Sequence, residues 1–451
     1  MPRMPKSPTF PLLIHARGER VAVWHDQVID RERCLAHIHR LAEELPDSRF
    51  AINLCNDRYV FMVALAAAML RGQTTLLPPG RAPKLIEELA ADYAGSYCLV
   101  DEPSEIKEVG RHMVSLDETN ASSDEQTVPE IPSDQIAAIV FTSGSTGRPN
   151  PNPKRWGDLV HGLRLARQRF EFKSNQRETI LATIPPQHMY GLEVSIVLPL
   201  VAGLCFHAGH PFFPEDIRRV ISALPEPRTM FTTPTHLRAC VESGLKWPHL
   251  SRIVSATAPL SADLASRAEE IFHCHVMEIY GCTEAGSMAS RRTVEGDLWR
   301  FYDGISSEER DGVVYVRGEH LPEPVPLNDF IEEQIDSRFK LLGRHADLVN
   351  IAGNRASLSD LNLKLNAIEG VRDGVFIMPD KQADEDVWRL AALVVAPDLE
   401  KKEILTALAE RINPVFLPRP LYKVESLPRN AMGKLPREAL SELLEQLRKS
   451  P

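Results

Sequence analysis

Small hydroxyl and glycine residues follow directly on an apolar run, residues 136–140, in the first third of the chain. The sequence there reads Phe141-Thr142-Ser143-Gly144-Ser145-Thr146-Gly147-Arg148-Pro149. Glycines let main-chain N–H groups close on an anion without a Cβ in the way, and Ser and Thr hydroxyls add donors. The pattern predicts a buried strand that delivers a phosphate-binding loop, although such clusters also form ordinary turns. No Gly-Lys-Ser/Thr follows at the required spacing, which excludes a Walker A loop.

Four further short motifs follow in chain order. They are Tyr280-Gly281-Cys282-Thr283-Glu284, Leu327-Asn328-Asp329, Gly343-Arg344-His345-Ala346-Asp347 and Gly433-Lys434-Leu435-Pro436-Arg437. Each alone is a weak signal, but the five in this order resemble the acyl-adenylate-forming superfamily, which includes acyl-CoA synthetases, peptide-synthetase adenylation domains and luciferases. The resemblance covers residues 135–440.

The resemblance implies a two-step ligase reaction. ATP first transfers AMP to a small carboxylic acid and releases pyrophosphate, and a thiol then takes the acyl group. Negative charge crowds around one phosphorus in the first step, so donors and cations must be aimed at it. The implied cofactors are ATP and Mg²⁺.

The resemblance also assigns the groups that hold the nucleotide. Thr283 would donate to the α-phosphate, and Glu284 would bind Mg²⁺, which prefers carboxylate and phosphate oxygens. Tyr280 would offer an aromatic face to adenine, and Asp329 would accept from both ribose hydroxyls. The other expected nucleotide contacts are Thr142, Ser143, Gly144, Ser145, Thr146, Gly147, Ala258 and Arg344. Asp329 and Arg344 also fit a turn aspartate and a surface arginine.

Lys434 would supply a mobile cation between the substrate carboxylate and the α-phosphate. A lysine suits this role because it is a compact charge on a flexible stem. The alternative is a solvated lysine at the start of a charged C-terminal helix. In the second step a small C-terminal domain would rotate, withdraw Lys434 and bring in residues 351–355, where Gly353 would let a pantetheine arm pass close to the main chain.

The stretch Pro185-Pro186-Gln187-His188-Met189-Tyr190-Gly191 resembles a motif at the mouth of the acyl pocket. His188 is interpreted as a gate or wall, with a structural histidine as the alternative, and Tyr190 and Gly191 belong to the same motif. Ala256 and Gly281 imply room for a flat ring or a slender chain, although small residues also allow close packing.

Two departures from the family pattern stand out. The lysine that usually follows the loop proline is Asn150, and the next cation is Lys154 in Pro151-Asn152-Pro153-Lys154-Arg155-Trp156. Lys154 would either reach the terminal phosphates or only be exposed. The interval from Glu284 to Asp329 is also short, which predicts a reduced β subdomain.

This compact build with its proline-containing extension is similar to ligases of aryl polyene and xanthomonadin-type pathways, which load a hydroxybenzoate-like acid onto an acyl carrier protein. The resemblance therefore implies carrier-protein phosphopantetheine as the acceptor, with free coenzyme A as the alternative. Basic residues of the C-terminal stretch suit either partner; they are Arg411, Arg419, Lys423, Arg429 and Arg437. A non-catalytic scaffold is a further interpretation, against which the retained Thr283, Glu284, Asp329, Arg344 and Lys434 argue.

The elements that must position these residues alternate between helix and strand, which predicts an α/β fold with parallel layers. Asn56 or Asp57 would cap a helix that ends at Arg71-Gly72. Residues 159–170 show helical spacing, residues 179–184 and 253–256 are strand-like, and residues 261–272 form another helix. Residues 119–132 are polar and lack periodicity, so they are interpreted as a connector.

Short strands are expected over residues 311–319 and 330–342. After Gly343 the pattern predicts a compact α+β segment, with strands near residues 375–378 and 390–395 and helices near 399–411 and 437–447. The predicted organisation is a large N-terminal domain, residues 1–343, of layered α/β subdomains and a small mobile C-terminal domain, residues 344–451.

Composition narrows the class of protein. The chain has 451 residues, of which 43% are hydrophobic and 25% charged, with a formal net charge of -10. An acidic chain disfavours general nucleic-acid binding. The longest apolar stretch, residues 61–70, is too short to span a bilayer, and residues 1–10 lack a signal-peptide core. Seven cysteines without a CxxC spacing indicate reduced thiols and a cytoplasmic protein.

Overall fold

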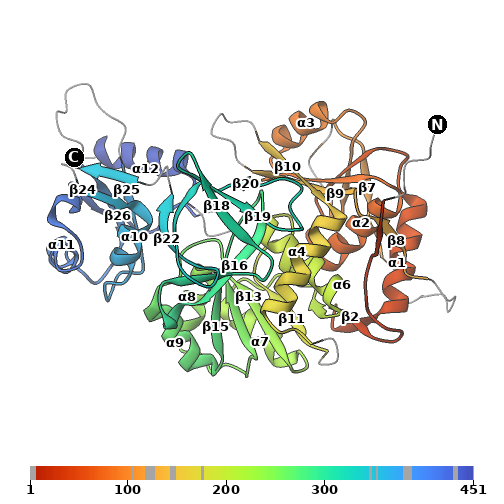
Figure 1. Cartoon of the computed structure of the whole chain (residues 1–451), viewed down its shortest axis with the longest axis horizontal. Helices are drawn as coiled ribbons and strands as arrows, with labels where there is room; N and C mark the ends of the chain where they lie inside the picture. Colours follow the sequence, from red (N-terminus) through yellow and green to blue (C-terminus); the bar gives the residue numbers. More distant parts are fainter. Residues whose placement is uncertain are drawn as a thin grey trace.

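The computed structural model describes residues 7–103, 106, 108–116, 127–142, 149–173, 177–344, 348–351, 354–378, 389–429 and 435–449. Two large sheets and a C-terminal group of elements follow one another along the long axis of the molecule (Figure 1). No helix in these ranges is both long and apolar enough to cross a membrane.

The helices have the following bounds. They are α1 Arg31–Glu44, α2 Arg58–Leu70, α3 Pro83–Asp92, α4 Trp156–Arg169, α5 Met189–Leu192, α6 Leu198–Ala202, α7 Pro214–Ala223, α8 Pro234–Glu242, α9 Ala262–Phe272, α10 Leu358–Asn366, α11 Lys401–Ala409 and α12 Arg437–Lys449. A π-helix, η1 (Glu193–Val197), joins α5 to α6, and the short 3₁₀ turns are η2 Thr293–Glu295 and η4 Pro414–Phe416.

The first large sheet has six strands in the order β10-β9-β5-β4-β6-β7. Their bounds are β4 Phe50–Asn53, β5 Thr74–Leu77, β6 Tyr97–Val100, β7 Arg111–Met113, β9 Ile136–Thr142 and β10 Asn150–Arg155. All neighbours pair in parallel except β9 and β10, which are antiparallel. The apolar run before the loop is therefore a strand, as predicted, and it lies next to the sheet edge.

The second large sheet has eleven strands in the order β21-β22-β17-β16-β15-β14-β13-β11-β12-β2-β3. Their bounds are β2 Arg20–Trp24, β3 Gln27–Asp30, β11 Thr179–Ala182, β12 Cys205–His207, β13 Arg228–Thr232, β14 Arg252–Ser255, β15 His275–Cys282, β16 Gly286–Arg292, β17 Leu298–Phe301, β21 Asp329–Glu333 and β22 Arg338–Arg344. Strands β15 to β2 pair in parallel along this order, so their carboxyl ends meet at one edge, where ligands bind in open α/β sheets.

Helix α2 lies in the largest hydrophobic cluster and is buried along nearly its whole length. It begins after Asp57, whose carboxylate accepts from the N–H groups of Tyr59 and Val60, and it ends before Gly72, which has φ +68°. Both predicted helix ends are confirmed. The residues expected to form a buried helix rather than a membrane span do so.

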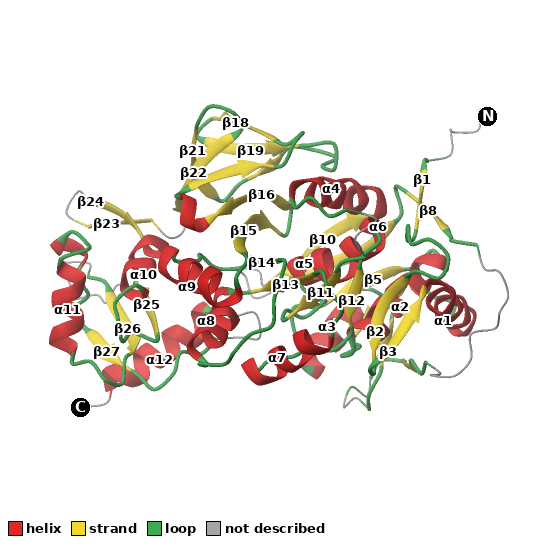
Figure 2. Ribbon diagram, turned by 90° about the horizontal axis from the view of Figure 1, so that it is seen from below, coloured by secondary structure: helices red, strands yellow, loops and turns green. Residues whose placement is uncertain are grey.

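The smaller sheets account for the other strands. A three-stranded sheet contains β18 Ser306–Arg310, β19 Val313–Arg317 and β20 Val325–Pro326, and it stands with β21 and β22 on one side of β15 and β16 (Figure 2). Strands β1 Thr9–Pro11 and β8 Glu130–Pro132 pair with each other. The prediction of a connector over residues 119–132 is thus wrong at its C-terminal end, where buried Ile131 pairs with Phe10. This strand has only three residues, too few to show a period in the sequence. Residues 117–126 lie outside the described ranges.

The C-terminal elements form an α+β group, as predicted. Strands β25 Asp373–Ile377 and β26 Ala391–Val395 are antiparallel, and β26 pairs in parallel with β27 Leu421–Lys423. Strands β23 Leu348–Ile351 and β24 Asn354–Ser357 form a separate hairpin. Of the five hydrophobic clusters, three draw on residues up to 341 and two on residues from 349. The domain boundary at residues 343 and 344, and the mobility of the second domain, stay predictions.

All seven cysteines are free thiols. The α/β class, with a large N-terminal part and a smaller C-terminal part, is confirmed.

Candidate functional site

Strands β9 and β10, which flank the predicted phosphate loop in the sequence, pair with each other. Thr142, the last residue of β9, pairs with Asn150, the first residue of β10. Ser143, Gly144, Ser145, Thr146 and Gly147 lie outside the described residues, so their assignment to the phosphates stays a prediction. Strand β10 carries prolines 151 and 153 and is the outermost strand, where prolines that lack an N–H are tolerated.

Thr283 and Glu284 lie in the turn between β15 and β16. Gly281 must lack a side chain, because a Cβ there would lie 2.4 Å from the carbonyl oxygen of Gly286 across the hairpin. Gly286 has φ +76°, a conformation that side chains disfavour. Glu284 is exposed, and Thr283 is partly buried. The small size of Gly281 therefore has a packing reason, independent of the room it was expected to leave for an acyl group.

A hydrogen bond joins two of the predicted nucleotide residues. The hydroxyl of Tyr280 donates to Oδ2 of Asp329 at 2.8 Å. The Tyr280 ring is mostly buried between Trp299 and Phe339, with centroid distances of 5.6 and 5.7 Å. Asp329 also pairs in register with Arg344 across β21 and β22. The structure thus brings together three residues that are far apart in the sequence, at the end of β15.

The loop expected to border adenine follows β14. Thr257 has φ +79°, which is uncommon for a residue with a branched side chain, and Ala258 beside it is partly buried. The loop is fixed below by Glu278, whose Oε1 accepts from the N–H of Leu260 at 2.9 Å. The other carboxylate oxygen accepts from Arg291 and Thr293 at 2.8 and 3.0 Å. The sequence reasoning missed Glu278, whose only signal is a single acidic residue within a mostly apolar strand.

The predicted acyl-pocket motif is packed tightly against itself. A Cβ on Gly191 would lie 1.9 Å from the carbonyl oxygen of Pro185, so only glycine fits there. Tyr190 is buried, and its hydroxyl donates to the carbonyl of Val254 at 3.0 Å. His188 is partly buried and precedes α5, and Ala256 is buried one residue after β14. The motif therefore lies beside the carboxyl ends of β13 and β14.

A buried arginine that the sequence reasoning missed, Arg58, contacts the chain just before this motif. The buried guanidinium of Arg58 donates to the carbonyls of Ala182 and Ile184, and also to those of His207 and Gly209, at 2.7 to 3.1 Å. Burial lowers the pKa of Arg58 to about 10. Four main-chain acceptors compensate this charge, so Arg58 holds α2 against the carboxyl ends of β11 and β12. Its only sequence signal is an arginine one residue after the Asp57 cap.

Lys154 is neither exposed nor directed to solvent. Only 8% of its surface is accessible, and its Nζ donates to the carbonyl oxygen of Glu284 at 2.8 Å. Burial lowers the pKa of Lys154, and the nearby carboxylates, Glu193 first, oppose that shift. Of the two alternatives for Lys154, the exposed lysine is wrong, because β10 places this side chain under the turn at residues 283–285.

Glu284 fits the expected role toward Mg²⁺. It presents an exposed carboxylate beside Thr283, and Mg²⁺ is usually bound by one or two carboxylates together with substrate phosphates and water. Over the described ranges no group of three or more His, Cys, Asp or Glu side chains could hold a metal without such help. The donor set therefore suits a magnesium–nucleotide complex better than a protein-enclosed metal.

Several predicted residues have no described side-chain position. Lys434 and Gly353 lie outside the described residues, and only the main-chain pairing of Arg344 is described. Among the basic residues proposed for the acceptor, Arg429 forms an ion pair with Asp373 at 2.6 Å, and Lys423 donates to the carbonyl of Leu399 at 2.6 Å. Arg411 donates to the carbonyl of Ala407 at 2.7 Å. These contacts within the C-terminal part weaken the case for a basic docking face.

The sequence matches a family model described as AMP-binding enzyme over residues 16–307. Among curated relatives, triostin synthetase I of Streptomyces triostinicus is 23% identical over 445 residues, covering 85% of this chain and 82% of its own. The 2-succinylbenzoate–CoA ligase of Staphylococcus epidermidis is 24% identical, covering 68% of this chain and 69% of its own. The solved structure of O-succinylbenzoate coenzyme A synthetase from Bacillus subtilis with ATP and magnesium has a TM-score of 0.79 at 18% identity, covering 93% of this chain and 96% of its own.

Proposed function

Because the chain belongs to the family of AMP-binding enzymes, we propose that it joins an aromatic carboxylic acid to a phosphopantetheine thiol. As a ligase of this family it uses ATP and Mg²⁺, and it forms an acyl-adenylate before the acyl group passes to a thiol. The proposal concerns the identity of the acid, the thiol acceptor and the residues that act.

The observation that carries the proposal is the hydrogen bond between Tyr280 and Asp329. It fixes a carboxylate beside the turn that bears Thr283 and Glu284. A carboxylate can accept about four hydrogen bonds, so the bond from Tyr280 does not exhaust Asp329. We assign Asp329 to the ribose hydroxyls, Thr283 to the α-phosphate and Glu284 to Mg²⁺. Arg344 stands opposite Asp329 in register, which supports its assignment to the same nucleotide.

The role of Tyr280 is sharper than the sequence suggested. Its ring is mostly covered by Trp299 and Phe339, and its hydroxyl is committed to Asp329. We propose that Tyr280 orients Asp329 and offers adenine only the edge of its ring. Ala258, in the strained loop after β14, would border the other side of the base with its main chain.

In the adenylation step, a carboxylate oxygen of the acid attacks the α-phosphorus and pyrophosphate leaves. The loop at residues 143–148 would hold the leaving phosphates with N–H groups and hydroxyls, and Lys434 would stand between the acid and the α-phosphate. Preorganised donors of this kind lower the barrier where charge develops. Bound Mg²⁺ would neutralise part of the phosphate charge.

An aromatic acid is supported by two observations. The Staphylococcus epidermidis relative acts, by its name, on 2-succinylbenzoate. Ala256, at the expected floor of the pocket, is small and buried beside the motif at residues 185–191. A benzoate-type acid, with or without a ring hydroxyl, is therefore the substrate class that we propose, with His188 and Tyr190 near its entrance.

Two sources of the thiol remain as candidates. The compact build and its proline-containing extension favour an acyl carrier protein, whereas the named 2-succinylbenzoate–CoA ligase favours coenzyme A. Both acceptors present the same phosphopantetheine arm, for which Gly353 would leave room. Five buried free thiols agree with the reducing, cytoplasmic setting that we propose for the reaction.

The test is a carboxylate-dependent exchange of pyrophosphate into ATP over hydroxybenzoates, cinnamates and medium-chain acids. The best acid is then offered with coenzyme A or with a phosphopantetheinylated carrier protein, and thioester formation is measured. We expect exchange with a benzoate-type acid and a strong preference for one acceptor. No exchange with any acid would contradict the ligase and favour a nucleotide-binding scaffold.

A further inference from the structure

Two buried charged side chains from distant parts of the chain contact the main chain at and just after the turn at residues 283–285. Lys154 lies near the end of β10, and Glu193 is the first residue of the π-helix η1. Their accessible fractions are 8% and 6%. Lysine and glutamate are almost never this buried unless a partner compensates their charge, so the partners of both side chains identify what they do.

The partner of Lys154 is the main chain of the turn. Its Nζ donates to the carbonyl oxygen of Glu284 at 2.8 Å. A hydrogen bond from a charged donor is stronger than one between neutral groups. The contact therefore fixes the orientation of the peptide group that follows Glu284, on the buried side of the turn, while the Glu284 side chain is exposed on the other side.

The partner of Glu193 is the main chain just beyond the same turn. Its Oε1 accepts from the N–H of Ser287 at 3.1 Å. The approach is possible because Gly286 has no side chain: a Cβ there would lie 2.6 Å from Oε1. The positive φ of Gly286 and the closeness of the carboxylate thus belong to one local arrangement.

The two contacts have matching polarity. A cation meets a carbonyl oxygen, and an anion meets an N–H, three residues apart on one turn. The opposite charges of Lys154 and Glu193 also attract each other. Loss of the Lys154 cation would leave Glu193 as a buried, less compensated charge, which is costly.

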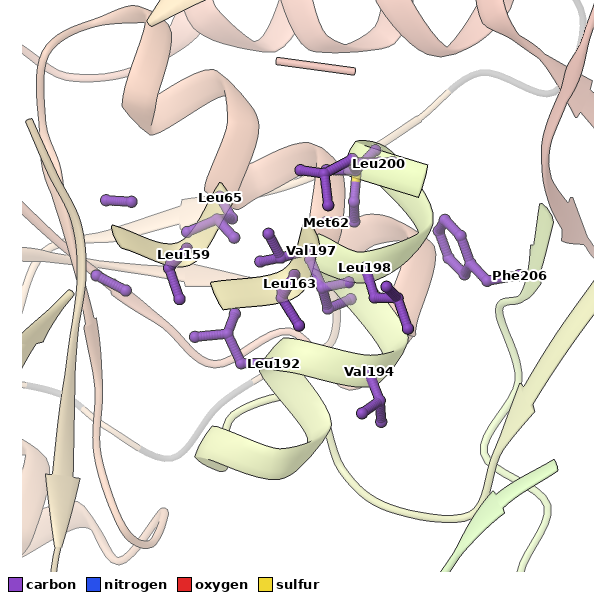
Figure 3. Packing of buried hydrophobic residues seen from close by; sticks show 14 of the residues in the cluster. Met62, Leu65, Leu159, Leu163, Leu192, Val194, Val197, Leu198, Leu200 and Phe206 are labelled. Atoms are coloured by element: carbon purple, nitrogen blue, oxygen red, sulfur yellow. The ribbon is translucent and has the colours of Figure 1, made fainter. Parts of the chain in front are cut away.

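Both side chains are anchored by other parts of the predicted site. Glu193 lies two residues after the acyl motif, and its neighbours Leu192 and Val194 lie in the packed cluster with Met62 and Leu163 (Figure 3). Lys154 is on the strand that leaves the phosphate loop, at a register shift beside Arg155. The turn is therefore held between the acyl side and the phosphate side of the site.

We propose that Lys154 and Glu193 are positioning residues for adenylation, which together hold the main chain of the turn so that Thr283 and Glu284 face the magnesium–nucleotide complex. This role rests on the proposed functions of Thr283 and Glu284. It also explains how a chain with Asn150 after its loop proline uses the displaced lysine, which acts through the protein main chain and not on a phosphate.

The test compares Lys154→Met, Glu193→Gln and the double variant with the parent at pH 8. We expect Lys154→Met to lower the kcat of pyrophosphate exchange by about tenfold to a hundredfold, the scale of a misplaced positioning group. Its Kd for MgATP, measured by calorimetry, should rise at least about fivefold, while the KM for the acid changes little. The double variant should be no worse than Lys154→Met, because the two residues act on one turn.

Lys84→Met is the matched control, because this lysine is exposed on α3 with 87% of its side chain accessible. It should keep the kcat, the MgATP Kd and the melting temperature of the parent. A Lys154→Met protein that melts earlier but binds MgATP and turns over like the parent would show a merely structural role and overturn the proposal.

If Lys154→Met does not fold, the MgATP Kd of Glu193→Gln tests the proposal instead. An MgATP Kd at least about threefold weaker than that of the parent supports the proposal, and an unchanged Kd overturns it. Absence of exchange by the parent with every acid refutes the proposed function instead, so the two failures are distinguishable.

Discussion

Two hairpins end at the predicted nucleotide site, and they are built in different ways. The β9/β10 hairpin joins an apolar strand to a proline-containing edge strand, most of which is exposed. The β15/β16 hairpin lies inside the eleven-stranded sheet, with a close glycine contact and buried carboxylates beneath it.

The difference lies in what determines each conformation. Around β9/β10 the sheet edge and the local sequence suffice, because prolines restrict the chain by themselves. Around β15/β16 the turn depends on Lys154 from β10 and Glu193 from η1, and Glu278 of β15 holds the neighbouring loop after β14. We therefore expect the first hairpin, apart from buried Lys154, to tolerate substitution. Changes in the second hairpin should affect both stability and nucleotide binding.

The largest effect is expected for Gly286→Ala. The new Cβ would occupy a backbone with φ +76° and lie 2.6 Å from Oε1 of Glu193. Left-handed strain and overpacking together should lower the free energy of unfolding by about 2–4 kcal/mol, measured by urea denaturation. Gly312→Ala is the control, because Gly312 has the same φ but nothing within 4 Å; it should lose only about 1 kcal/mol. Equal losses of stability in Gly286→Ala and Gly312→Ala would show that the β15/β16 turn is not specially constrained.

The next effect is a pH dependence at Glu193. Burial raises the pKa of Glu193 to about 7, and the N–H of Ser287 and the charge of Lys154 oppose that shift. A raised carboxyl pKa means that its contribution to stability is full below the unfolded value and is lost as pH rises through about 7. The amide introduced by Glu193→Gln cannot ionise, so this variant should gain stability over the parent between pH 5 and pH 8, by roughly 1–2 kcal/mol.

Thermal melting of both proteins across that pH range checks this prediction. The groups that face Glu193 are Lys154 from β10, Ser287 from β16 and the buried hydroxyls of Tyr190 and Tyr302. Lys154→Met provides the control, because loss of the cation should move the midpoint of the dependence to higher pH. If the stability difference between Glu193→Gln and the parent did not change with pH, ionisation of the buried Glu193 carboxyl could not be its cause.

A smaller effect is expected for Tyr280→Phe. The variant loses the hydrogen bond to Asp329 and keeps the ring between Trp299 and Phe339. A hydrogen bond to a charged group contributes about 1.5–3 kcal/mol when buried and less when partly exposed, so we expect a loss of stability of about 1 kcal/mol and a several-fold higher KM for ATP. Exchange kinetics measure the KM, with Tyr315→Phe on β19 as the control. An unchanged KM for ATP would show that Asp329 does not need the hydroxyl of Tyr280 for its role in ATP binding.

The smallest effect is expected for Pro153→Ala in β10. The strand is at the sheet edge, so the change affects mainly the unfolded chain, by about 0.4–1 kcal/mol. Urea denaturation and exchange kinetics should both stay close to the parent. If Pro153→Ala lowered the free energy of unfolding by more than about 2 kcal/mol, the β9/β10 hairpin would be as constrained as the β15/β16 hairpin. The two hairpins would then not differ in the way we propose.

Much of the secondary structure could be predicted because its signals are local. The Asp57 cap, the glycine after α2, the periodicity of α4 and the apolar strands β9, β11 and β14 all appear in short windows. The strand β8 was missed because three residues carry no period. The assignments of Ser143 to Gly147, Gly353 and Lys434 stay predictions, since those residues lie outside the described part of the chain.

The candidate site divides in the same way. The motif order pointed to the type of chemistry, and the family resemblance of their motifs selected Thr283, Glu284 and Asp329, whose roles stay predictions. Arg58, Glu193 and Glu278 could not, because a single charged residue in an apolar segment gives no hint of its partner.

For Gly281 the structure favours one of the two interpretations, space in a pocket or close packing. A Cβ added at Gly281, or at Gly191 in the acyl motif, would lie 2.4 or 1.9 Å from a main-chain carbonyl oxygen. Both glycines are therefore explained by close main-chain packing, which no local pattern distinguishes from an open pocket.

By itself the sequence determined much of the order of the elements and the ends of α2, since these depend on local conformational preference. It also gave candidates for binding a magnesium–nucleotide complex, since those depend on functional-group chemistry. Only the tertiary structure decided the position of Lys154. A lysine beside prolines is expected to be exposed, yet sheet pairing folds it under a turn 130 residues later in the chain. The physical reason is that burial and partner choice for a charge depend on which distant main-chain groups the fold brings within hydrogen-bond distance.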